Sequence, residues 1–84
     1  MDKSVKEGKV MTYNDIRKSI TCSVWCYTNG RYTIKEALQM IIKDIDNYTF
    51  YIYDIDKRIS TQNRLYKQGM HQLTKAIEKM ERQN

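Results

Sequence analysis

The residues best suited to chemistry lie near the end of the chain, where one histidine stands in a row of basic residues. Lys67, His71, Lys75 and Lys79 have the four-residue spacing that places side chains on one face of a helix. Arg64 and Arg82 continue the row at either end, three residues away. A cationic stripe of this kind suits phosphate groups or an acidic protein surface. A solvated helix face, paired with Glu78 and Glu81, explains the same pattern. The sequence leaves both interpretations open.

Metal binding and thiol chemistry find little support. Cys22 and Cys26 have the spacing C-x-x-x-C rather than the C-x-x-C of redox and zinc sites. His71 is the only histidine, and a zinc site needs four ligands of this kind. We therefore expect reduced, structural thiols, with no bound metal and no cofactor.

Catalysis by paired carboxylates is also unsupported. The tripeptide Asp-Ile-Asp occurs at residues 44–46 and again at 54–56. Ten residues of helix turn through about 1000°, roughly 80° short of three full turns, so the two copies do not share one face well. The chain contains no glycine-rich phosphate loop, no G-x-S-x-G and no HExxH. We predict a protein that is not an enzyme.

A second candidate surface is aromatic. The stretch NYTFYIYD, residues 47–54, holds four aromatic residues. Exposed aromatic side chains are typical anchors of protein interfaces. We select as interface candidates Trp25, Tyr32, Phe50, Tyr51 and Tyr53. The alternative is that a central helix with two neighbours needs a wide apolar stripe, which these rings would fill.

The elements that must position these residues are predicted to be helices. From Ile34 to Met80, alternate steps of four and three residues meet apolar side chains at nearly every position, as in a coiled-coil seam. The seam crosses residues 47–54 in phase, which predicts helix there despite the strand-forming residue types. Capping residues at 60–63 predict a turn between two antiparallel helices. One unbroken helix of about fifty residues, paired in a dimer, is the alternative.

An earlier helix is predicted from residue 12 onward. Apolar residues recur at helical spacing from Tyr13 to Tyr27, after a Thr12 cap with Asp15 three residues on. Gly30 would end this helix in the left-handed conformation. Thr33 and Glu36 form a second capping box at the start of the seam. The alternative for residues 19–34 is a short β-hairpin across Asn29 and Gly30.

Length and composition limit the architecture to one small domain. The chain has 84 residues, no proline and three glycines, which favours long helices. We expect an all-α fold: a small three-helix bundle, or a helical hairpin with a long coiled-coil-like central helix. Residues 1–11 are predicted to be a flexible basic lead-in, and 12–84 a single helical domain. With no membrane span and no secretory signal, we expect a cytoplasmic protein.

Charge and composition indicate how such a protein could act. Residues 1–33, 34–56 and 57–84 carry +3, −3 and +5, from six bases and three acids, two and five, and seven and two. An acidic middle segment between two basic ones suits an antiparallel bundle or an antiparallel dimer. The abundance of lysine, isoleucine, tyrosine and asparagine is typical of an AT-rich genome, such as that of a low-GC bacterium or its phage.

The functional hypothesis from the sequence is stoichiometric binding. We predict a phage or mobile-element protein that acts as an inhibitor or adaptor on a host macromolecular machine, monomeric or homodimeric. The first alternative is a transcription regulator that binds nucleic acid through the basic C-terminal helix. The second is a structural coiled-coil dimer.

Overall fold

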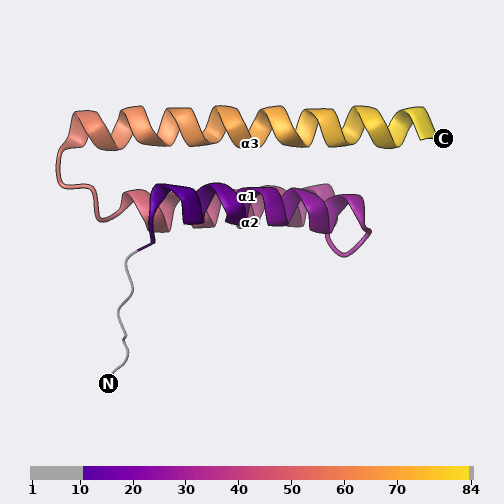
Figure 1. Cartoon of the computed structure of the whole chain (residues 1–84), viewed down its shortest axis with the longest axis horizontal. Coiled ribbons are helices and arrows are strands. Elements are labelled where there is room, and N and C mark those ends of the chain that lie inside the picture. Colours follow the sequence, from indigo (N-terminus) through magenta and orange to yellow (C-terminus); the bar gives the residue numbers. More distant parts are fainter. Residues whose placement is uncertain (1–10, 84) are drawn as a thin grey trace, which may run out of the picture.

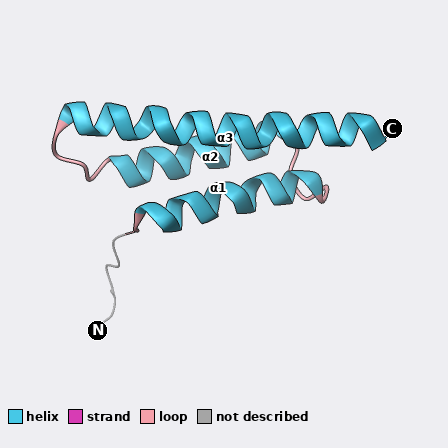
Figure 2. Cartoon of the chain, turned by 45° about the horizontal axis from the view of Figure 1, so that its top comes forward, coloured by secondary structure: helices cyan, strands magenta, loops and turns pink. Residues whose placement is uncertain are grey.

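Three helices make up the protein. The computed structural model describes residues 11–83, and its helices are α1 (Tyr13–Thr28), α2 (Ile34–Thr49) and α3 (Ile55–Gln83). They run up, down and up, each in contact with the other two (Figure 1). The predicted all-α, three-helix fold is confirmed, and the alternative β-hairpin at 19–34 is wrong, because residues 11–83 contain no strand (Figure 2). The proposed lead-in, apart from Met11, lies outside the described residues.

Both predicted capping boxes form. The Thr12 hydroxyl accepts a hydrogen bond from the Asp15 amide at 3.1 Å, and the Asp15 carboxylate accepts one from the Thr12 amide at 3.0 Å. Thr33 and Glu36 repeat the arrangement at 3.1 and 2.9 Å. After α1 the chain reverses through Gly30, whose φ of 76° is open to glycine at little steric cost. Local capping chemistry therefore fixes the start of α1 and of α2.

The predicted break at residues 60–63 is wrong, and so is the unbroken fifty-residue helix. Residues 60–63 lie inside α3, and the chain turns instead at residues 50–54. The Thr49 hydroxyl donates to the Ile45 carbonyl at 2.8 Å and accepts from Gln62 Nε2 at 3.0 Å. Asp54 then caps α3 by accepting from the Lys57 amide at 3.2 Å. The helix predicted across residues 47–54 holds only for 47–49.

The core lies where the three helices meet. Its buried side chains are Ile16, Ile20, Ala37, Ile41, Ile45, Leu65 and Leu73. Gly69 of α3 faces this core, since a Cβ there would lie 3.1 Å from Ile41 Cγ2 and 3.6 Å from Ile20 Cγ2. The absence of a side chain at Gly69 thus lets α3 come close to both neighbours.

Helix length explains which seam positions are left uncovered. At 1.5 Å per residue, the 29 residues of α3 span about 43 Å, against about 24 Å for the 16 residues of α2. α3 consequently extends beyond its neighbours at both ends (Figures 1 and 2). Ile55 and Ile59, which the seam placed in the core, are exposed for this reason.

Two aspartates of α2 tie it to its neighbours. Asp44 accepts a hydrogen bond from the Ser19 hydroxyl of α1, and Asp46 accepts one from the Tyr66 hydroxyl of α3 at 2.7 Å. Burial, together with this bond and the charge of Asp46, raises the pKa of Tyr66 from 10.0 to about 12. The first Asp-Ile-Asp copy is therefore structural, with one carboxylate serving each neighbouring helix.

Candidate functional site

The most prominent surface feature lies at the corner where α2 leads into α3. Five large apolar side chains are exposed there: Phe50 by 70%, Tyr51 by 78%, Tyr53 by 99%, Ile55 by 66% and Ile59 by 50%. We call these five side chains the corner surface. The connection that carries the three aromatic residues is at the left of Figure 1, away from the turn between α1 and α2.

The backbone beneath the corner surface is held by an arginine from the first turn of α3. Arg58 Nε and Nη2 donate to the Ile52 carbonyl at 3.0 and 2.8 Å, and Nη2 also lies 3.4 Å from the Phe50 carbonyl. The Ile52 amide donates back to the Thr49 carbonyl at 3.0 Å. These hydrogen bonds satisfy backbone carbonyls at and after the end of α2, which have no partner within the helix. A fixed backbone thus presents exposed rings.

The rings contact each other at the corner. Phe50 and Tyr51 have ring centroids 5.3 Å apart with planes at 89°, an edge-to-face pair. Tyr53 stands alone, almost fully in solvent. The interpretation that Phe50, Tyr51 and Tyr53 fill the far side of the core is therefore excluded by their exposure.

The two other aromatic candidates lie elsewhere. Trp25 is exposed near the end of α1, with the Arg31 guanidinium 5.6 Å from its ring centroid, a cation–π contact. Tyr32 is half-buried against the core. Both flank the turn before α2, whereas the corner surface follows α2. The five predicted interface residues thus fall at opposite ends of a helix about 24 Å long.

The predicted cationic stripe is exposed along α3. All six side chains are solvent-accessible, and we call them the basic face: Arg64, Lys67, His71, Lys75, Lys79 and Arg82. At about 100° per residue, Arg64, His71, Lys75 and Arg82 fall within about 40° of one another, and the two remaining lysines lie about 60° to either side. The core-facing Leu73 lies on the opposite side of the helix.

The predicted chemical groups remain scattered. Cys22 is exposed and Cys26 half-buried, and both are free. Among the described residues, no three histidine, cysteine or acidic side chains are grouped to hold a metal ion. None of the described helices has the length and hydropathy needed to cross a membrane.

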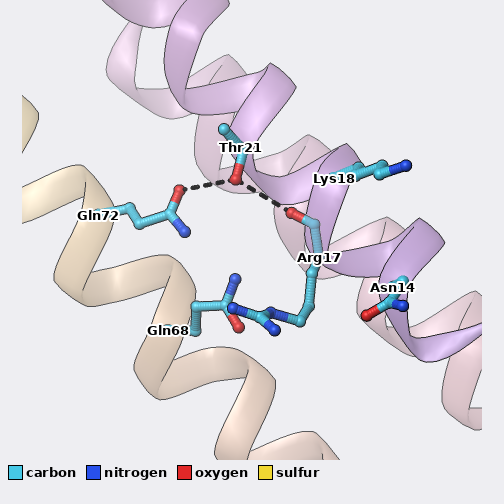
Figure 3. A pocket seen from close by; sticks show the side chains of 6 residues that line it. All are labelled: Asn14, Arg17, Lys18, Thr21, Gln68 and Gln72. Carbon is cyan, nitrogen blue, oxygen red and sulfur yellow. Dashed lines mark hydrogen bonds between the residues drawn. The ribbon is translucent and has the colours of Figure 1, made fainter.

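The sequence missed the parts of the corner that shape it. Arg58 was not identified, and the isoleucines of the corner were assigned to the core. One available signal was Asp54, an N-cap residue three positions before Lys57 that marks a helix start after the aromatic run. Also unforeseen was a shallow polar groove between α1 and α3, lined by Asn14, Arg17, Lys18, Thr21, Gln68 and Gln72 (Figure 3).

Comparisons of the chain with protein-family models, curated proteins and solved structures gave no match. The chemistry of the two surfaces is thus the basis for any functional argument.

Proposed function

We propose that this protein is a non-enzymatic binding protein that acts stoichiometrically, as an inhibitor or adaptor, on a protein component of a larger machine. The corner surface is the proposed contact with the partner. The single observation that carries the proposal is the exposure of three aromatic rings on the α2–α3 connection, whose backbone is held by hydrogen bonds. The origin in a phage or mobile element, argued from composition, stays a prediction.

The size of the corner surface supports this proposal. An aromatic side chain buries about 150–250 Å² when covered, so three rings offer roughly 450–750 Å². A standard interface buries about 800 Å² per partner. Aromatic residues are also enriched among the few that dominate binding energy. Adding Ile55 and Ile59 brings the corner surface close to the size of a complete interface centre.

The hydrogen-bonded backbone of the α2–α3 connection also supports the proposed protein-binding function. Binding costs free energy when loops must be ordered, and a connection already fixed in the free protein avoids much of that cost. Arg58 holds two connection carbonyls, Gln62 holds Thr49, and Asp54 caps the next helix. The arrangement matches a preorganised protein-binding site.

Alanine variants test the proposal in cells that contain the partner. Phe50→Ala and Tyr53→Ala should abolish co-purification of the partner and leave the helical circular dichroism and Tm unchanged, because neither ring packs in the core. Ile42→Ala, which truncates an exposed apolar side chain on α2, is the matched control and should retain the partner. Retention of the partner by both corner variants would contradict the proposal.

A second copy of this chain is another candidate partner for the same surface. Ile55 and Ile59 stand one helical turn apart on a segment of α3 that neither α1 nor α2 covers, as in one side of a coiled-coil seam. Sedimentation equilibrium should then show a dimer that Ile59→Ser dissociates. A monomer at all concentrations would leave a different protein as the partner.

A further inference from the structure

The basic face of α3 has a charge pattern of its own. Residues 57–77 contain five lysine or arginine residues and one histidine, and no acidic residue. From Arg64 to Arg82 the basic face extends about 27 Å along one helix. On the side of α3 away from the core, this surface is continuously cationic from Arg64 to Lys75. Glu78, about 40° from Arg64 in direction, makes it mixed in charge from there to Arg82.

No ion pair within residues 11–83 neutralises the six side chains of the basic face. Glu78 and Glu81 lie near Arg82 without pairing with it. Like charges one turn apart destabilise a helix by a few tenths of a kcal/mol per pair. An anionic ligand would remove this repulsion.

The groove between α1 and α3 extends the surface sideways. Figure 3 shows the Arg17 guanidinium beside Gln68, with Lys18 further along α1. The Thr21 hydroxyl lies 3.1 Å from the Arg17 carbonyl and 3.3 Å from Gln72 Oε1, so it joins the two helices. Gln68 and Lys75 are seven residues apart on α3, so their side chains differ by only about 20° in direction around the helix axis. The groove therefore borders the basic face. One cation of α1, Arg17, therefore adjoins those of α3, whereas the Lys18 side chain points away from α3 in Figure 3.

The composition of the basic face favours nucleic acid over protein. The exposed large apolar residues of α3 in its described part are Ile55, Ile59 and Met70. The two isoleucines precede the basic face, and Met70 points about 120° away from Arg64. A protein interface needs an apolar or aromatic centre, whereas interfaces with nucleic acid are polar and strongly positive. The basic face is polar and strongly positive, like an interface with nucleic acid.

Its lack of aromatic residues favours a duplex over a single strand. Proteins that bind single strands stack the bases on aromatic side chains. The exposed rings here are at the corner surface and at Trp25, off the basic face. Lysines that contact phosphates position a duplex and do not read its sequence. Among nucleic acids, the phosphate backbone of a double helix matches the basic face best.

We propose that the basic face of α3, with Arg17 at its border, binds the phosphate backbone of double-stranded nucleic acid without sequence preference. This site is separate from the corner surface and goes beyond the proposed protein-binding function. A protein bound at the corner would leave the basic face free to lie against a duplex held by the same machine.

Fluorescence anisotropy with a labelled random-sequence DNA duplex tests this proposal. With about five phosphate contacts, affinity should fall roughly 500-fold between 50 and 200 mM salt. Lys67→Ala/Lys75→Ala should weaken binding and reduce the salt slope by about 1.8, which leaves a fall of about 40-fold. Glu78→Gln/Glu81→Gln should tighten binding at both salts.

The matched control is Lys35→Ala/Lys43→Ala, which removes two exposed lysines, also eight residues apart, from α2. It leaves the same net charge of +3, from +5 minus 2, as the α3 variant. Unchanged binding by this control places the site on α3. An equal loss in both variants, or no binding at 50 mM salt, would overturn the proposal. Tyr53→Ala should bind DNA normally, so failure of the corner surface and failure of the basic face are told apart.

Discussion

At the scale of single residues, exposure separates side chains that stabilise the fold from those free to bind. Leu65 is fully buried between the helices, whereas Tyr53 is almost fully exposed although both are large and apolar. Sequence periodicity missed Leu65, which lies off the seam although it is buried. It left Tyr53 off the seam as well, which agrees with the exposure of that ring, but it did not predict the connection that carries Tyr53. The difference should be measurable in stability.

We expect Leu65→Ala to lower the free energy of unfolding by about 2–5 kcal/mol, because it leaves a cavity in the core. Tyr53→Ala should change it by no more than about 0.5 kcal/mol, since no folded contact is lost. Urea denaturation followed by circular dichroism measures both. A loss above 2 kcal/mol for Tyr53→Ala would mean that this ring packs against the protein after all.

Tyr66 gives the fold a dependence on alkaline pH. Its pKa rises from 10.0 to about 12 on folding, so the folded state keeps the proton at pH values where the unfolded chain releases it. The stabilisation is thus complete below pH 10 and is lost progressively between pH 10 and 12.

Tyr66→Phe removes this contribution together with the hydrogen bond to Asp46. The difference in urea midpoint between the native protein and the variant should be constant up to about pH 9 and shrink above pH 10. Measurement of both midpoints from pH 7 to 11.5 checks this. A difference that stays constant to pH 11.5 would show that the phenol is not held in its protonated form by the fold.

At the scale of elements, the capping boxes predicted the helix starts correctly, whereas the capping residues at 60–63 and the periodicity across 50–54 were misleading. The capping boxes at Thr12 and Thr33 and the left-handed Gly30 form as predicted, because each depends on neighbouring residues alone. The seam failed at residues 50–54 because Ile52, Ile55 and Ile59 continue its phase across a connection. A period detects apolar spacing and does not show whether another helix covers it.

The α2–α3 connection should depend on Arg58. Arg58→Gln removes the guanidinium that binds the Phe50 and Ile52 carbonyls, and we expect a loss of about 1–2 kcal/mol in stability. Hydrogen exchange at the Ile52 amide should accelerate, and partner binding should weaken. Arg64→Gln, an exposed change on the same helix, is the control and should alter neither stability nor exchange. Unchanged exchange in Arg58→Gln would show that the connection is held by other bonds.

At the scale of the whole molecule, the short helices α1 and α2 pack against the longer α3, which extends beyond both of them. The excess length of α3 exposes Ile55 and Ile59 at the corner, and its outward side carries the basic face. The sequence predicted the three helices, the cationic stripe and three of the five corner residues. It could not show how these surfaces lie, because that depends on where α2 ends and how far α3 overhangs.

The central claim is that the corner surface contacts a protein partner. The most direct measurement places a photo-crosslinking phenylalanine analogue at Tyr53, where the ring is exposed and the fold tolerates the change, and at exposed Gln39 on α2 as the control. Irradiation of producing cells should yield one discrete crosslinked species from position 53 and none from position 39. The same products from both positions, or none from position 53, would contradict the claim.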